Sequence, residues 1–108
     1  MTVNDLITLF SFKPLCLPDP SKEITGGYAG DLLSWVMGKA TSGCAWVTIM
    51  SNMNIVTVST LTDPACIILS EGVIPDDGVI AKAEEQGINI LSTEFDTFTT
   101  CGLISKEL

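Results

Sequence analysis

The 108-residue chain is 46% apolar and carries a formal net charge of −8. Its length fits one domain and leaves little room for a second, while its apolar content predicts a packed core and excludes a disordered chain. The five basic residues are all lysines, and histidine is absent. The acidic balance argues against nucleic acid or an anionic membrane as a partner. Without histidine, one copy cannot assemble a Ser-His-Asp or Cys-His catalytic set.

The sequence shows no targeting or membrane signal. It does not open on a basic segment followed by a long apolar stretch, and no apolar run approaches the ~20 residues of a membrane span. We therefore expect a cytoplasmic location.

The four cysteines are scattered and form no C-x-x-C pair; they are Cys16, Cys44, Cys66 and Cys101. This spacing is not typical of zinc ribbons or redox dithiols. Because most of them lie in or beside apolar runs, we expect buried, reduced thiols and no metal or other cofactor. A four-thiolate metal cluster is the alternative.

The N-terminal quarter predicts a helix and an edge segment. Thr2 and Asp5 have the spacing of a capping box, which predicts a short opening helix. Residues 13–21 hold three prolines, so we expect an edge strand or an extended segment there.

Gly26, Gly27 and Gly30 precede an amphipathic pattern and predict a turn that leads into a helix beginning near Gly30. Such a turn can bring a ligand close to the main chain and to a helix N-terminus. Asp31 falls in the first turn of this predicted helix, where a carboxylate matches the helix dipole. No lysine lies in the turn, so a polyphosphate ligand is not expected.

The predicted helix has one apolar face, made of Ala29, Leu32, Leu33, Val36, Met37 and Ala40. At ~100° per residue, Trp35 falls away from this face. It is a candidate subunit contact, and packing under the N-terminal segment is the alternative.

The middle of the chain predicts two buried strands separated by a helix. Residues 44–50 and 65–70 are β-rich apolar runs of strand length. Residues 54–61 are ambiguous, because β-branched side chains favour a strand while the flanks favour a helix. We expect a helix with Asn52 or Asn54 at its N-cap.

The last third predicts a helix, a strand and a closing helix. Pro75 is expected to start the first helix, with acidic residues in its first turn, and Gly87 to end it. Residues 88–91 form a short strand. The residues 93–96 repeat the capping-box form, which predicts a closing helix whose inward side chains are Phe95, Phe98 and Leu103.

This alternation predicts an α/β fold, with a small, mainly parallel sheet flanked by helices. In such sheets ligands gather at the carboxyl ends of the strands. The candidate ligand-binding residues are Gly26, Gly27, Tyr28, Asp31, Ser51, Asn52, Asn54, Glu71, Gly72, Thr93, Asp96 and Thr97.

Several weak motifs together resemble the small stand-alone DRTGG-domain proteins of bacteria and archaea. The motifs are 26–28 with 30–34, 46–49, 54–56, 65–72, 83–88 and the threonine-rich 96–100. The resemblance covers residues 24–103 as a domain core, preceded by a helix and an extended segment in 1–23. It implies a fold similar to the N-terminal domains of HPr kinase/phosphorylase and of Mur ligases, and the central domain of long phosphotransacetylases is also similar. It further implies a regulatory or ligand-sensing role.

The chain departs from the family's name motif at residues 70–72, where Ser-Glu-Gly stands in place of a threonine and two glycines. Glu71 would repel a phosphate at this loop. A phosphate-binding loop of the form G-x-x-x-x-G-K-[ST] is also absent, so kinase activity is not expected.

Three functions follow as hypotheses. The leading one is a non-catalytic, homo-oligomeric module that binds a small metabolite or nucleotide at the strand ends and acts on a partner enzyme. The second is a structural assembly subunit with Trp35 at its interface. The third is an enzyme in which Asp31 or Asp96 serves as acid or base.

Overall fold

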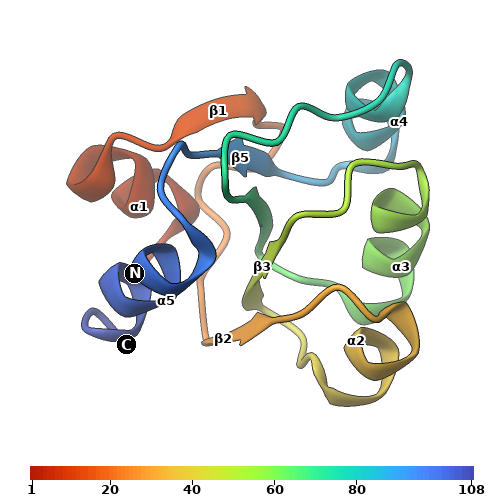
Figure 1. Cartoon of the computed structure of the whole chain (residues 1–108). Helices are drawn as coiled ribbons and strands as arrows, with labels where there is room; N and C mark the ends of the chain where they lie inside the picture. Colours follow the sequence, from red (N-terminus) through yellow and green to blue (C-terminus); the bar gives the residue numbers. More distant parts are fainter.

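A five-stranded sheet separates two layers of helices in the computed structural model, which describes residues 1–108 (Figure 1). In spatial order the strands are β1 (Lys13–Cys16), β5 (Ile90–Ser92), β4 (Cys66–Leu69), β3 (Cys44–Thr48) and β2 (Gly26–Ala29). Strands β2 to β5 are parallel, and β1 runs antiparallel to β5. The predicted α/β fold with a mainly parallel sheet is therefore confirmed.

The helices cover both faces of the sheet. Helices α2 (Leu33–Lys39), α3 (Asn54–Thr62) and α4 (Val79–Gln86) lie on one face, and α1 (Val3–Phe10) and α5 (Thr97–Ser105) lie on the other (Figure 1). No helix of this structure combines the length and the apolar character that crossing a membrane requires.

The core forms two clusters, one on each side of the sheet, because alternate strand residues point to opposite faces. In β3, Trp46 packs with the α2–α4 layer, whereas Ala45 and Val47 pack with the α1–α5 layer. All five residues of β3 are buried. This double burial explains the continuous apolar run that the sequence shows there.

Several local predictions are confirmed. Thr2 and Asp5 form the capping box of α1, and residues 13–16 form an edge strand. The ambiguous segment 54–61 is helical in α3. The expected N-cap at Asn52 or Asn54 is wrong, because the cap position is Met53; the Asn52 side chain instead accepts a hydrogen bond from the backbone N–H of Asn54 at 2.9 Å.

The predicted turn at Gly26 and Gly27 is wrong, because both residues belong to strand β2. They pair in register with Cys44 and Ala45 of β3, and neither has a positive φ angle. The glycine that turns the chain into β3 is Gly43, whose φ is 81°.

The helix that follows begins at Leu33, so the placement of Asp31 in its first turn is also wrong. The backbone before Leu33 is held against β3, because the Gly30 carbonyl accepts a hydrogen bond from Trp46 Nε1 at 3.0 Å. Only Val36 of α2 is fully buried, whereas Leu32 and Met37 are exposed. Trp35 is 56% exposed, as its helical position predicted.

The two later helices also begin after their predicted starts. Helix α4 begins at Val79, after an N-cap at Gly78. The helix starts late because the backbone N–H of Asp76 donates to the Ser51 carbonyl at 2.9 Å. Helix α5 has Asp96 at its N-cap, where Thr93 was expected. Because of this shift Phe95 and Phe98 are exposed, and Thr100 and Ile104 are the buried residues of the helix.

Candidate functional site

The loops after the parallel strands lie together at the carboxyl ends of the strands, and they carry most of the predicted site residues. Asp31 follows β2, Ser51 follows β3, Glu71 follows β4 and Thr93 follows β5. Because β2 to β5 are parallel, these loops lie at the same end of the sheet, as the sequence predicted.

Asp31 ties the loop after β2 to the end of β3. Its Oδ1 accepts hydrogen bonds from Thr48 Oγ1 at 2.7 Å and from the Ile49 backbone N–H at 3.0 Å. Thr48, which the sequence reading missed, is 1% exposed, so Asp31 satisfies a buried hydroxyl. Its carboxylate therefore has a structural use.

Ser51, Asn52 and Asn54 serve the local structure around the start of α3. Ser51 Oγ donates to Asp76 Oδ1 at 3.0 Å, which connects the loop after β3 with the segment before α4. Asn52 and Asn54 form the turn that opens α3. These side chains are exposed or half-exposed, and none of them lines either of the two hollows described below.

Glu71 connects the loop after β4 to the start of α5. Its backbone N–H donates to the Phe95 carbonyl at 2.8 Å, and its Oε2 accepts the Thr97 N–H at 2.9 Å. The hydroxyls of Ser70 and Thr97 lie 2.7 Å apart. The carboxylate of Glu71 thus already occupies a donor at a helix N-terminus, where an anionic ligand would otherwise bind.

Asp96 occupies a second donor of the same helix. Its Oδ1 accepts the Thr99 N–H at 2.6 Å, and this bond holds the pKa of Asp96 below its usual value. Two carboxylates therefore fill the first turn of α5. A phosphate would therefore find these two N–H donors already occupied, in addition to the negative charge of Glu71.

A hollow of about 310 Å³ lies at the carboxyl end of β5, beside β1. Small-ligand pockets begin at about this size. Thr93 is the predicted site residue among its walls. The complete lining is Phe10, Ser11, Lys13, Ser92, Thr93, Glu94 and Phe95.

The charged and aromatic walls of this hollow come from two distant parts of the chain. Lys13 is paired in register with Ser92, so β1 brings it beside the residues that follow β5. Lys13 forms no ion pair. Glu94 packs over the loop that follows β4, where a Cβ at Gly72 would lie 2.5 Å from Glu94 Oε2. The sequence reading missed Phe10 and Lys13 because only strand pairing places them here.

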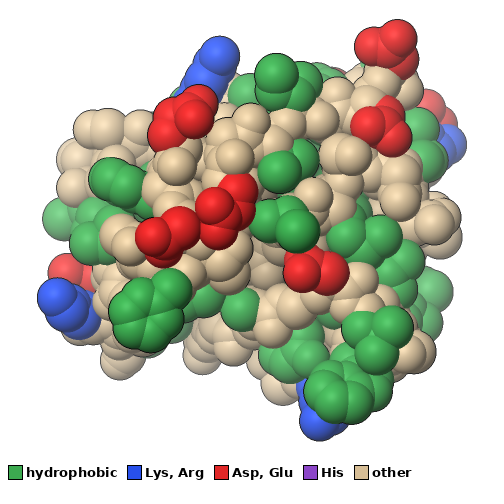
Figure 2. Space-filling view, in the orientation of Figure 1, with side chains coloured by type: hydrophobic (Ala, Val, Ile, Leu, Met, Phe, Trp, Pro, Cys, Tyr) green, Lys and Arg blue, Asp and Glu red, His purple; other side chains and the backbone are tan.

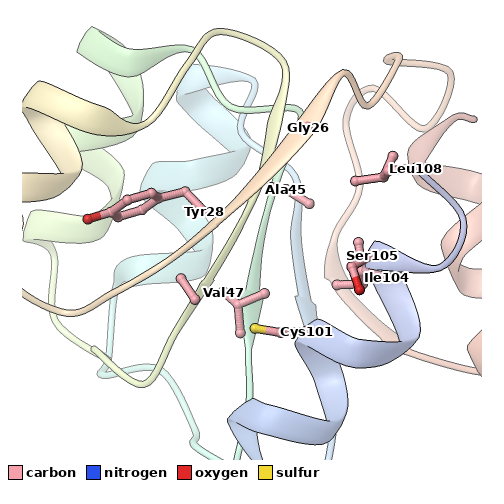
Figure 3. Close-up of a pocket in the computed structure, with 10 residues that line it drawn as sticks. Gly26, Tyr28, Ala45, Val47, Cys101, Ile104, Ser105 and Leu108 are labelled. Carbon is pink, nitrogen blue, oxygen red and sulfur yellow. The ribbon is translucent and has the colours of Figure 1, made fainter.

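A second hollow, an apolar groove of about 390 Å³, separates α5 from strands β2 and β3 (Figure 3). The Tyr28 side chain points away from α5, toward the layer of α2, so Tyr28 contributes only its backbone (Figure 3). Small residues leave this space unfilled. The lining is Gly26, Gly27, Tyr28, Ala29, Ala45, Val47, Cys101, Ile104, Ser105 and Leu108.

The cysteines behave as core residues. Cys16, Cys44 and Cys66 are buried and free, as predicted, and Cys101 is half-buried in the groove. Burial raises the pKa of the Cys66 thiol to about 12. No group of three His, Cys, Asp or Glu side chains is placed to hold a metal ion.

The strand order and the two helical layers define a small α/β domain with a mainly parallel sheet. A solved structure with this fold contains the CBS and DRTGG domains of the regulatory region of Clostridium perfringens pyrophosphatase, complexed with the activator diadenosine tetraphosphate. It shares 15% identity with a TM-score of 0.73, over 95% of this chain and 45% of that one. The chain thus spans less than half the length of that structure.

Residues 33–106 match the DRTGG domain, and the chain belongs to this family. The resemblance seen in the sequence motifs is therefore confirmed. No curated protein matches the chain.

Proposed function

We propose that this chain is a non-catalytic regulatory module that binds a small metabolite or nucleotide at the carboxyl end of β5 and acts on a partner enzyme. The observation that carries the proposal is the hollow beside β1, where a lysine without an ion pair, several hydroxyls and two phenylalanines line one space. This combination suits a ligand that has both a ring and an anionic group.

The charges of the hollow support a particular arrangement of the ligand. Lys13 is the positive group in its lining and would attract a carboxylate or a single phosphate. Glu94 would accept hydrogen bonds from hydroxyl or amino groups of the ligand and would repel a second anionic group. Phe10 and Phe95 offer apolar surfaces for a ring.

The comparisons support testing nucleotides first. The pyrophosphatase regulatory region that shares the fold was solved with a nucleotide activator. A regulatory module needs a partner, and in that protein the partner is the enzyme whose regulatory region contains the DRTGG domain.

The carboxylate-enzyme hypothesis has less support. Asp31 is engaged by Thr48 and Ile49, and Asp96 caps α5. The lowered pKa of Asp96 argues against the acid role, because a general acid needs a proton at neutral pH, and its hydrogen bond to the Thr99 N–H occupies an oxygen that a general base would use.

Isothermal titration calorimetry with AMP, ATP and diadenosine tetraphosphate tests the proposal. We expect at least one of them to bind the wild-type chain, and we expect Lys13→Ala to weaken binding about tenfold, or ~1.4 kcal/mol. Lys106→Ala is the matched control, since Lys106 also forms no ion pair and does not line the hollow. Binding by none of these nucleotides, or equal weakening by both substitutions, would count against this site.

A further inference from the structure

The two edges of the sheet differ in how they are protected against pairing with another chain. The β1 edge carries Lys13, Pro14 and an irregularity of the pairing between Pro14 and Cys16. Charged residues, proline and bulges are devices that prevent edge-to-edge association. The β2 edge, Gly26–Ala29, has none of them and lies at the end of the sheet without a partner strand.

Exposed apolar side chains lie on and just before α2, the helix that follows β2 in the chain. Leu32, Trp35 and Met37 are 59%, 56% and 45% exposed. Apolar side chains gather where α2 lies, at the lower right of the molecule (Figures 1 and 2). Lys39 Nζ lies 4.4 Å from the centroid of the Trp35 ring, so the one cation of α2 is directed to this ring.

The other layer is also open beside β2. The groove between β2 and α5 is apolar and ends at Leu108, which is 51% exposed (Figure 3). The β2 edge therefore has unfilled apolar surface on both sides of the sheet. Surface of this kind marks association sites.

The distribution of charge indicates which partner fits this edge. Residues 24–43 contain only one acidic and one basic residue, Asp31 and Lys39, so the rest of the chain carries the entire net charge of −8. Two copies repel each other through most of their surfaces. The β2 edge and α2 have no net charge, so a second copy approaches there with little of this repulsion.

We propose that two copies of this chain associate through their β2 edges, with the strands antiparallel about a two-fold axis that is perpendicular to the sheet. The two five-stranded sheets then become continuous, and the backbone groups on the free edge of β2 gain partners. A two-fold axis brings each surface against its own copy, so α2 adjoins α2 and the two apolar grooves adjoin each other. Trp35 of each copy lies in the contact.

Light scattering after size-exclusion chromatography and hydrogen exchange test this dimer. We expect the wild type at micromolar concentration to have twice the 11.5 kDa chain mass. We expect the amides of residues 26–29 to exchange more slowly as the protein concentration rises. Trp35→Glu and Gly26→Glu add like charges across the axis and are expected to weaken the dimer at least tenfold.

Both substitutions are compatible with the monomer, because Trp35 is exposed and a Cβ at Gly26 meets no atom within 4 Å. Phe98→Glu is the matched control, since it places the same charge at an aromatic residue that is 89% exposed and lies in the first turn of α5. Circular dichroism checks the folding of each variant.

The proposal is overturned if the wild type is a monomer at every concentration. It is also overturned if Phe98→Glu weakens a dimer as much as Trp35→Glu, or if residues 26–29 exchange at the same rate in dimer and monomer. These outcomes do not depend on nucleotide binding, because the hollow beside β1 lies at the opposite edge of the sheet.

Discussion

The hollow beside β1 and the groove beside β2 lie at opposite edges of one sheet and differ in chemistry. The hollow beside β1 and β5 has a lysine, a glutamate and hydroxyls among its walls, whereas the groove beside β2 and β3 is apolar. Polar groups that point into a space favour a ligand that can pair with them, while an apolar space favours burial against apolar surface. This difference supports our proposals of ligand binding at the β1 edge and association at the β2 edge.

The two edges are also anchored differently. The segment after β1 is held by Asn89, which is 1% exposed and exchanges hydrogen bonds with the backbone of Asp19. Strand β2 has small residues at three of its four positions and depends on its neighbour β3: Trp46 and Asp31 join the loop after β2 to that strand. Substitutions at these anchors show whether each edge responds separately.

Trp46→Ala is expected to have the largest effect. Trp46 is fully buried under α2 and α3 and donates to the Gly30 carbonyl, so its removal leaves a large cavity and an unpaired carbonyl. Losses of this kind destabilise a protein by ~3–5 kcal/mol. Urea unfolding followed by circular dichroism measures the change.

Trp35→Ala is the matched control for this prediction, because the second tryptophan is 56% exposed. The free energy of unfolding of the monomer should change by no more than ~0.5 kcal/mol. Equal losses for the two tryptophans would show that Trp35 is packed in the monomer, contrary to this structure.

Asn89→Ala is expected to cost about 2–3 kcal/mol, because it leaves buried backbone groups near Asp19 and the Ala65 carbonyl without partners. The effect should be largest at the β1 edge. Hydrogen exchange followed by mass spectrometry should show faster exchange around residues 17–22 than around residues 26–32. The reverse order would contradict the separate anchoring of the two edges.

Asp31→Ala is expected to cost about 1–3 kcal/mol, since it leaves the buried Thr48 hydroxyl and the Ile49 N–H without their acceptor. Here the faster exchange should appear around residues 28–33. Asp31→Asn keeps an oxygen acceptor and should recover part of the loss. If Asp31→Asn and Asp31→Ala destabilise equally, the hydrogen bonds are not what Asp31 contributes.

The sequence predicted the strands and helices wherever one local pattern dominated. The β-rich composition and the length of the apolar run around Trp46 indicate a buried strand, and the capping box at Thr2 marks a helix start without tertiary information. Three helix starts were placed too early, near Gly30, Pro75 and Thr93, because tertiary hydrogen bonds hold the preceding residues in extended or turn conformations.

The candidate site was less predictable than the fold. The residues predicted at the carboxyl ends of the strands do lie there, but most of them hold loops together, as Glu71 does at the start of α5. The hollow beside β1 depends on the antiparallel pairing of Lys13 with Ser92, across almost 80 residues of sequence. A local pattern contains no information about this pairing.

Gly27→Ala is expected to have the smallest effect and the opposite sign. A Cβ at Gly27 would lie 3.7 Å from the Ala45 carbonyl oxygen and 4.0 Å from Leu108 Cδ1, which are ordinary contacts. The residue lies in a strand without a positive φ, so alanine restricts mainly the unfolded chain and should stabilise the fold by about 0.4–1 kcal/mol. Thermal unfolding of the monomeric Trp35→Glu background measures this gain without the contribution of association.

Gly72→Ala is the contrasting variant, because the φ of Gly72 is 68° and Glu94 occupies the position of the new methyl group. This substitution should destabilise the fold. A loss of stability in Gly27→Ala would mean that the groove beside β2 is closed in solution.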